Sequence, residues 1–337
     1  MDIKDLTGLG KATNAILNSV SPAVAKLLDM VKARSDFKRF AAFIKEHETS
    51  DFKSLKYETP SSKIELEFTS RAPGGDDYIN GALSIKGQEI VAQQLNMDKV
   101  IVRAANELNS EENVSSESVD EDWLANFFEY AKLASGDYAQ ILWGKILAGE
   151  VKSPGAFSLR TVHTLRLMSK RHAQIFSTLA NILLQGDSKY FFFLIDVSYL
   201  KSIGIKEEDL IELKELGLIE QKQNFQKPHL LITDKNATFT YYDKKVFLFE
   251  RAVDMETALS NIHFFTVTKL GMEFLRLVPP AELREGYIEI VKKHFCQKTI
   301  DLRKGECSLY MANIIKVSEI EGERTGRAFE HDGLIKI

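Results

Sequence analysis

Apolar residues recur at helical spacing most densely between residues 120 and 184. Spacings of three and four residues place them on one face of a helix, and Ser, Asp or Gly residues separate the segments. The pattern predicts four short helices, which begin at Asp120, Asp137, Ser158 and Ser169 and end near Gly136, Gly149, Met168 and Leu184. The side chain of each starting residue is expected to cap its helix, and Gly149 is expected to end the second helix in a left-handed conformation.

The first third of the chain has a looser pattern. Residues 6–44 read as one or two amphipathic helices with a break at Ser21-Pro22, and residues 76–108 read as one long helix. Residues 46–75 predict a linker with little packed structure, containing one possible strand at 63–68. Acidic and polar residues between 107 and 122 predict a solvated loop before the dense block.

After residue 187 the spacing of apolar residues changes, and short alternating runs appear between helical segments. An apolar run at 190–195 and alternating runs at 229–233, 238–242, 246–249 and 262–267 predict strands, while 199–204 and 206–216 predict short helices. Thr268 is expected to cap a helix over 269–277. A further helix at 281–295 and strands within 307–320 complete the pattern.

These elements predict a mixed α+β fold with separate helical and antiparallel parts. We expect five segments: an amphipathic helical arm (1–45), a linker (46–75), a helical domain (76–186), a winged-helix-like domain (187–280), and a C-terminal helix with strands (281–337). The order of helix, helix, hairpin and final helix after residue 187 is what favours the winged-helix interpretation.

Charge and cysteine content narrow the class of protein. The 337 residues carry a formal net charge of -4, so an interaction with nucleic acid or an anionic membrane needs a local basic patch. Two cysteines, Cys296 and Cys307, are too few for a secreted disulfide framework, and no run of 18 apolar residues predicts a membrane span. We therefore predict a cytoplasmic protein.

A local basic patch is present in the second half of the dense block, where no acid occurs between Val151 and Gly186. Arg160, His163 and Arg166 recur at a spacing of three, and Lys170 and Arg171 follow. Such a cluster can bind phosphates, which makes these five residues candidates for nucleic-acid binding. The alternatives are pairing with the acidic loop upstream, or a solvated face.

Two further surfaces are candidates for interactions. The aromatic side chains of Trp123, Phe127 and Trp143 are candidates for self-association or for binding a protein partner. Residues 6–45 have the apolar and basic faces of a helix that lies on a membrane surface, although a packing helix or coiled-coil arm fits them as well. In the winged-helix interpretation, the acidic sequence of residues 206–216 disfavours a DNA-reading helix and favours a protein-binding or structural use.

The sequence indicates no reaction. It lacks the phosphate-binding, dinucleotide, zinc-protease and nucleophile-elbow patterns, and neither a metal nor a cofactor is predicted. His294 lies near Cys296, but no Asn or Asp that would orient the histidine is identifiable. We therefore predict no catalytic residues, and an enzyme is the less favoured class.

The dense block also carries a family resemblance. The acid-rich lead into Trp123, the LWGKILAGE segment at 142–150, the Pro154-Gly155 turn and the SLRT start of the next helix at 158–161 resemble a bacterial family, domain of unknown function 2806. The block is similar, more distantly, to the helical domain of alpha-type abortive-infection proteins. The resemblance implies a cytoplasmic bacterial protein. By analogy, it also implies a phage-defence or prophage-linked component, and it supplies no catalytic residues.

Together these observations predict a non-enzymatic interaction module that acts by protein binding and self-association. Nucleic-acid binding through Arg160, Arg166, Lys170 and Arg171 is the first alternative, and membrane action through residues 6–45 is the second.

Overall fold

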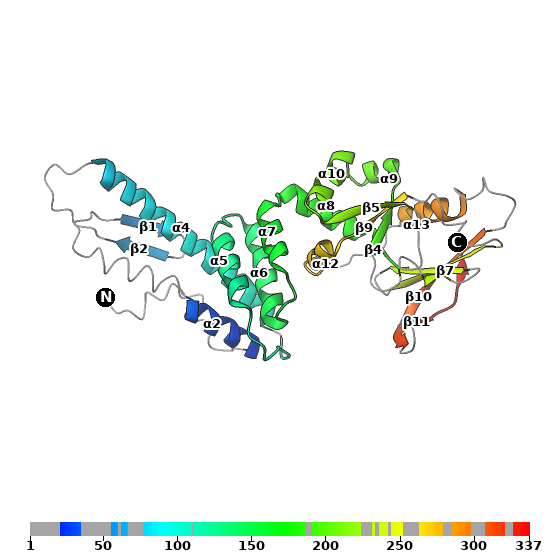
Figure 1. Ribbon diagram of the computed structural model, residues 1–337, viewed down its shortest axis with the longest axis horizontal. Helices are drawn as coiled ribbons and strands as arrows, with labels where there is room; N and C mark the ends of the chain where they lie inside the picture. The colour runs from blue at the N-terminus through cyan, green and yellow to red at the C-terminus, as the bar shows by residue number, and fades with distance from the viewer. Residues whose placement is uncertain are drawn as a thin grey trace. The chain divides into compact units, whose positions relative to one another are not determined.

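The fold combines helices with antiparallel strands in two compact units, residues 1–166 and 167–337 (Figure 1). The predicted α+β class is thereby confirmed. The computed structural model describes residues 21–34, 55–59, 62–66, 77–109, 111–186, 191–223, 231–232, 236–241, 244–251, 263–278, 285–297, 307–320 and 326–337. None of the helices in these ranges is long and apolar enough to cross a membrane.

The first unit is mainly helical. Its elements are α2 (Pro22–Arg34), β1 (Leu55–Thr59), β2 (Ser62–Leu66), α4 (Asp77–Leu108), α5 (Glu121–Ala131), α6 (Asp137–Lys152) and α7 (Leu159–Leu167). The long helix predicted at 76–108 is continuous, and β1 pairs antiparallel with β2 inside the predicted linker. Most of the predicted N-terminal arm lies outside the described residues.

Helix ends in this unit follow local hydrogen bonding. Asp120 caps α5 as predicted, because its Oδ1 accepts a hydrogen bond of 2.8 Å from the Trp123 N–H. The predictions for α6 were wrong at both ends. Gly136 is the N-cap and Asp137 is already helical, and the helix passes through Gly149 to Lys152. Gly149 is needed for space, since a Cβ there would lie 2.5 Å from the Phe157 ring.

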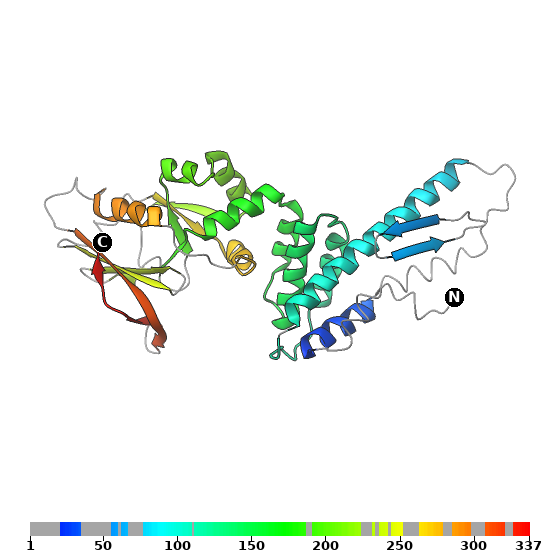
Figure 2. The ribbon, with the colours of Figure 1, turned by 180° about the vertical axis from the view of Figure 1, so that it is seen from behind.

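A close crossing of α4 and α6 forms the centre of the first unit (Figure 2). Gly144 permits it, because a Cβ at this position would lie 2.5 Å from the Arg103 Cβ. Val100, Ala104 and Ile146 are fully buried in this unit. The small residue therefore allows the two helix backbones to approach closely.

Two polar side chains, buried Glu150 and half-buried Lys26, join the segments around this core. Glu150 is 1% exposed, and its carboxylate accepts hydrogen bonds from the N–H groups of Gly155 (2.6 Å) and Phe157 (2.9 Å). The Lys26 ammonium on α2 donates to the carbonyl oxygens of three residues, Ser115 (2.9 Å), Glu117 (2.6 Å) and Val151 (3.2 Å). Burial lowers the pKa of Lys26, and Glu117 and Glu150 oppose that shift.

The second unit is built on one antiparallel sheet. Its helices are α8 (Lys170–Ala180), α9 (Val197–Ser202), α10 (Glu207–Glu215), α12 (Lys269–Leu275) and α13 (Glu285–Lys292), which continues as a π-helical turn, Lys293–Gln297. Its strands are β3 (Leu184–Gln185), β4 (Phe191–Leu194), β5 (Ile219–Gln223), β6 (Leu231–Ile232), β7 (Asn236–Tyr241), β8 (Lys245–Arg251), β9 (His263–Val267), β10 (Cys307–Ile320), β11 (Gly326–His331) and β12 (Ile335–Lys336).

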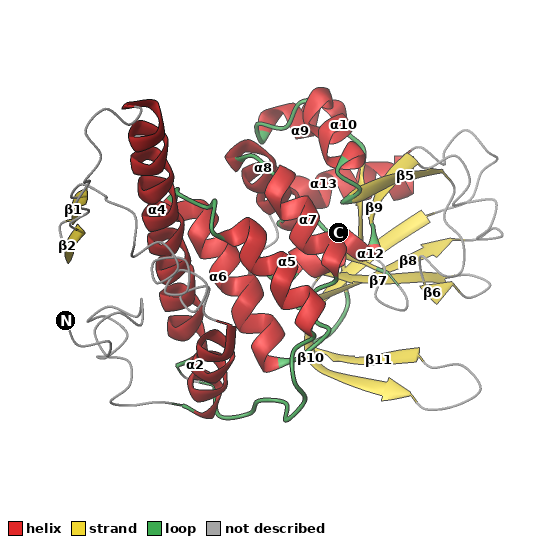
Figure 3. Cartoon of the chain, turned by 60° about the vertical axis from the view of Figure 1, so that its left-hand side comes forward, coloured by secondary structure: helices red, strands yellow, loops and turns green. Residues whose placement is uncertain are grey.

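The main strand order is β11-β10-β8-β7-β3-β4-β9-β5, with β12 beside β10 and β6 beside β7. Figure 3 shows β7 beside β8 and β5 beside β9. One face around Phe239 is packed with aromatic rings. Phe239 stacks on Phe247 and Phe295 at centroid distances of 5.1 and 4.9 Å, and Phe192 meets it edge-on at 6.0 Å. The strand predicted from the apolar run at 190–195 is β4, and all four of its residues are buried.

The capping predictions hold in this unit. Ser169 caps α8 by accepting from the His172 N–H, and Thr268 caps α12 by accepting from the Gly271 N–H. Helix α8 ends at Ala180, and Leu184 belongs to β3, so the fourth predicted helix is shorter than expected. Helix α8 and strand β3, which the sequence pattern grouped with the preceding helices, lie in the second unit. The winged-helix interpretation stays a prediction, and strands β5 and β9 are part of the larger sheet.

We expect Gly144→Ala to lower the free energy of unfolding of the first unit by about 1 to 3 kcal/mol, because the added methyl group overpacks the helix crossing. Both tryptophans, Trp123 and Trp143, lie in this unit, so denaturant titration followed by tryptophan fluorescence reports its unfolding. Gly136→Ala is the matched control, since a Cβ there has no atom within 4 Å. Equal effects of the two variants would contradict the close crossing.

The carboxyl group of Asp98 on α4 predicts that the stability of the first unit depends on pH. Burial raises the pKa of its carboxyl group to about 7, and the hydrogen bond from Gln94 (2.8 Å) only partly offsets this. Because the pKa is raised in the folded state, the folded protein keeps this proton at pH values above 3.8, where the unfolded chain has already lost it. The stabilisation that this carboxyl group contributes is therefore complete below pH 3.8, and it declines as the pH rises towards about 7.

We expect Asp98→Asn to remove this decline, because the amide carries no titrating proton. The variant should match the parent protein at acidic pH and exceed it in unfolding midpoint above about pH 7. Thermal unfolding followed by tryptophan fluorescence across a pH series measures the difference. Parallel pH profiles for the two proteins would contradict the assignment.

Candidate functional site

The predicted nucleic-acid-binding residues fall into two groups. Arg160, His163 and Arg166 lie on α7 in the first unit, whereas Lys170 and Arg171 lie on α8 in the second. All five side chains are exposed. Exposure alone does not make a site, and the contacts of these residues differ.

Two members of the α7 group pack against one tyrosine ring. The His163 ring meets the Tyr130 ring edge-on at a centroid distance of 5.1 Å, and the Arg166 guanidinium carbon lies 4.8 Å from the centroid of the same ring. This cation–π contact holds Arg166 against α5. Arg160 has no ion pair among the described residues. The group is therefore a basic face in which two of the three side chains pack on the Tyr130 ring. Phosphate binding there stays a prediction.

Arg171 is committed to an internal ion pair. Its Nε and Nη2 atoms donate to Asp209 Oδ1 (3.2 Å) and Oδ2 (2.6 Å) on α10, and Nη2 also donates to the Gly204 carbonyl oxygen (3.1 Å). The Asp209 side chain is only 9% exposed. A bidentate pair with a nearly buried carboxylate leaves Arg171 little capacity for an external phosphate.

A second contact joins the same two helices. His172 Nδ1 accepts a hydrogen bond from the Ser169 N–H (3.1 Å), so its Nε2 carries a hydrogen and donates to Glu212 Oε2 (2.9 Å). Asp209 and Glu212 are one turn apart on α10. The acidic face that disfavoured DNA binding thus faces α8.

The three aromatic residues proposed as an interaction surface are core residues. Trp123, Phe127 and Trp143 are 3%, 0% and 4% exposed. The Trp123 and Phe127 rings stack at a centroid distance of 5.1 Å, and Phe127 meets Trp143 edge-on at 5.3 Å. They consequently stabilise the packing of α5 on α6, and a partner surface has to be sought elsewhere.

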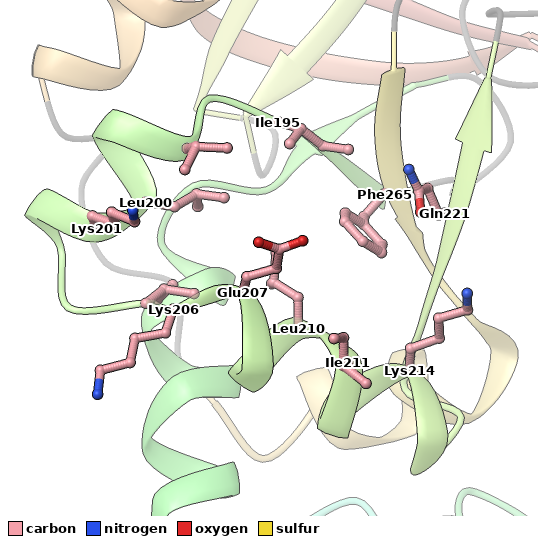
Figure 4. A pocket seen from close by; sticks show the side chains of 12 residues that line it. Ile195, Leu200, Lys201, Lys206, Glu207, Leu210, Ile211, Lys214, Gln221 and Phe265 are labelled. Carbon is pink, nitrogen blue, oxygen red and sulfur yellow. The ribbon is translucent and has the colours of Figure 1, made fainter.

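A groove in the second unit is the candidate binding site (Figure 4). It lies between α9, α10 and the sheet, and its volume is about 180 Å³. Its apolar walls come from the end of β4, from both helices and from β9. The lining residues are Ile195, Val197, Leu200, Lys201, Ile205, Lys206, Glu207, Leu210, Ile211, Lys214, Gln221 and Phe265.

The periodicity of α10 explains its contribution. Glu207, Leu210, Ile211 and Lys214 follow the spacing of one helix face, and all four line the groove. Residues Asp209 and Glu212 occupy the face bonded to α8. One short helix therefore has an acidic side that holds it in place and a mixed side that lines the groove.

The charges around the groove are unevenly placed. The Glu207 carboxylate points into the centre, in the space between Ile195 and Phe265 (Figure 4). Lys201 and Lys214 lie at opposite ends, and the Lys206 side chain points away. The interior thus presents one anionic group among apolar side chains, with one cation at each end.

The wall formed by Ile195 and α9 is held by neighbouring polar contacts. Asp196 Oδ1 caps α9 by accepting from the Tyr199 N–H (3.0 Å), and its Oδ2 accepts from the Lys293 ammonium (2.9 Å). The Lys293 hydrogen bond, followed by the Tyr199 N–H, lowers the pKa of Asp196. The His294 ring nitrogens lie 2.9 Å from the Ile290 carbonyl oxygen and 3.1 Å from that of Ile195. His294 therefore braces this wall.

The geometry limits the chemistry of the groove. Its volume is below the roughly 300 Å³ at which pockets begin to bury a drug-sized ligand, and close to the roughly 150 Å³ of a cavity that holds benzene. It fits one large side chain. Among the described residues, no three His, Cys, Asp or Glu side chains are grouped to hold a metal ion.

Comparison with known proteins places the chain in a family. A family profile described as "Protein of unknown function (DUF2806)" matches residues 86–292, which is more than half of the 337 residues. The chain belongs to the DUF2806 family. The match to DUF2806 runs from α4 to the end of α13 and includes every residue that lines the groove. Comparisons with curated proteins and with solved structures gave no match.

Sequence reasoning missed the groove in this DUF2806 protein. The positions 207, 210, 211 and 214 carry a helical period that was visible in the sequence. The acids at 208, 209, 212 and 215 drew attention to the total charge of the helix instead of to its separate faces. Phe265 and Ile195 approach α10 only through the fold.

We expect Asp196→Ala to lower the free energy of unfolding of the second unit by about 1 to 2 kcal/mol near neutral pH, through loss of the α9 cap. A depressed carboxyl pKa contributes stability above the unfolded value of 3.8, and this contribution is lost as pH falls through the folded value. The difference between variant and parent should therefore shrink as pH falls below 3.8.

Asp196→Asn should lose less stability, because the amide oxygen still caps α9. Amide hydrogen exchange of residues 197–202 measures the effect, with Glu208→Ala as a control in an exposed first turn. An undiminished difference at acidic pH would contradict the ionised pair.

Proposed function

We propose that this protein acts by binding a protein partner, and that the α9–α10 groove is its docking site. The observation that carries the proposal is an apolar depression sized for one side chain, with exposed apolar residues at its rim. Val197 and Ile211 both line the groove and are 55% and 51% exposed. Anchor side chains of protein interfaces fill pockets, and exposed apolar residues that lie together mark interaction sites.

A protein partner is favoured over nucleic acid at this groove. A nucleic acid would bring phosphates towards the Glu207 carboxylate and the remaining acids of α10. The alternative basic face has Arg160, Arg166 and Lys170 exposed, but Arg171 is engaged with Asp209. Nucleic-acid binding therefore stays the second candidate, supported by the α7 side chains alone.

Other parts of the functional hypothesis rest on the sequence. A cytosolic location is part of the proposal and is supported by the low cysteine content. A role in phage defence follows from resemblance only. Self-association stays a prediction, with the three buried rings no longer its basis. Membrane action through residues 6–45 concerns a segment of which only 21–34 is described.

Photo-crosslinking in cells that express the full chain tests the docking site. A benzophenone amino acid replaces Val197 or Ile211 in separate variants, and Leu167, which is 67% exposed in the same unit, serves as the control position. We expect one protein to be crosslinked from both groove positions and to be absent at residue 167. Its identification by mass spectrometry then permits a binding measurement with purified proteins.

In that measurement Ile211→Ser should weaken binding at least about fivefold, because truncation of an anchor residue costs more than about 1 kcal/mol. Leu167→Ser should leave the affinity unchanged. Equal crosslinking from residue 167, or an unchanged affinity of Ile211→Ser, would reject the groove as the docking site.

A further inference from the structure

The carboxylate of Glu207 distinguishes this groove from a simple apolar depression. It points into the centre (Figure 4), and among the described residues it forms no ion pair. Because Glu207 is exposed, water solvates its charge in the absence of a partner. A partner that covers the groove removes this water, which costs the solvation free energy of the carboxylate. This cost is offset only if the partner supplies a charged hydrogen-bond donor.

The walls suit the stem of such a donor. Ile195, Leu200 and Leu210 are apolar lining residues, and the Phe265 ring faces the same space. Lys and Arg side chains bury their methylene groups against apolar surface while the charged end meets a polar group. The Phe265 ring also provides a face for a cation–π contact. A volume of about 180 Å³ holds one such side chain.

The surrounding charges define the rest of the partner. A carboxylate inserted in the groove would meet Glu207 in apolar surroundings, where like charges strongly disfavour ionisation. Lys201 and Lys214, at the two ends, repel further cations beside the inserted one. Both lysines are exposed, so dissolved salt screens their charges within about 8 to 10 Å. The groove therefore selects a single cation and disfavours a basic run.

We propose that the groove recognises a single Lys or Arg side chain of a partner protein, with Glu207 as its counter-charge. This inference rests on the proposed docking function and specifies the chemical class of the anchor. Glu207 is the specificity-determining residue, and the apolar walls provide affinity that does not depend on charge.

Small analogues of the anchor test this on the full chain. The ligands are n-butylammonium, which reproduces the lysine side chain, butan-1-ol as a neutral equivalent, and pentanoate as an anionic one. Methyl NMR of isotope-labelled isoleucine reports binding through Ile195, Ile205 and Ile211, all of which line the groove. Ile315 on β10 is an exposed reference methyl outside it.

We expect n-butylammonium to shift the groove methyl signals with a dissociation constant about tenfold below that of butan-1-ol, in line with one charge-assisted hydrogen bond. Pentanoate should bind more weakly than the alcohol. Glu207→Gln should remove the preference for the cation, while Glu208→Gln, a neighbouring exposed acid, should retain it. Both substitutions are at exposed positions, so the fold is preserved.

The outcomes separate the two proposals. If butan-1-ol or pentanoate binds as tightly as the cation, or Glu207→Gln keeps the preference, recognition of a basic anchor is overturned and docking at the groove stands. If no ligand shifts the groove methyl signals while crosslinking from residues 197 and 211 succeeds, the basic anchor is again overturned alone. If both experiments fail, both proposals are overturned.

Discussion

The bidentate ion pair between Arg171 and Asp209 determines which face of α10 is turned to the sheet. Asp209 also accepts a hydrogen bond from the Lys206 N–H (2.8 Å), so one carboxylate fixes the start of α10 and its rotation. The His172–Glu212 contact repeats the restraint one turn later. Removing the guanidinium would leave a nearly buried carboxylate without its counter-ion, which is far more costly than losing a surface ion pair.

The groove depends on that rotation. An isolated helix of nine residues is unstable in water, so α10 depends on its contacts with the rest of the second unit, and its two sides make different contacts. Because the acids at 209 and 212 are bonded to α8, the residues at 210 and 211 cover the sheet beside Phe265. Stability and binding in the second unit are thus supplied by opposite sides of one element.

Local signals were predictable from sequence, and long-range pairings were not. The caps at Asp120, Ser169 and Thr268 depend on side chains within three residues of the atoms they bind, so their pattern sufficed. Gly149 looked like a helix end, but its role is set by Phe157, which only the folded turn brings near.

The same distinction applies to the candidate sites. Arg171 looked available for phosphate until the fold placed Asp209 beside it, 38 residues later. Trp123 and Trp143 were candidates for an interaction surface, but the packing of α5 on α6 buries them. In the groove, Ile195, Glu207 and Phe265 come from three elements, and a periodic pattern within each element carries no information about the others.

Helix α4 extends well beyond the crossing that anchors it. Its 32 residues span about 48 Å, while its contact with Gly144 on α6 is made near its C-terminal end by Arg103 and Ala104. Each residue inserted in the first turns would displace the preceding residues of the helix by about 1.5 Å along the axis and rotate them by about 100°. Helix α2, which comes earlier in the chain, stays joined to the core through Lys26. A change of length at the N-terminal end of α4 would therefore leave its crossing with α6 in place.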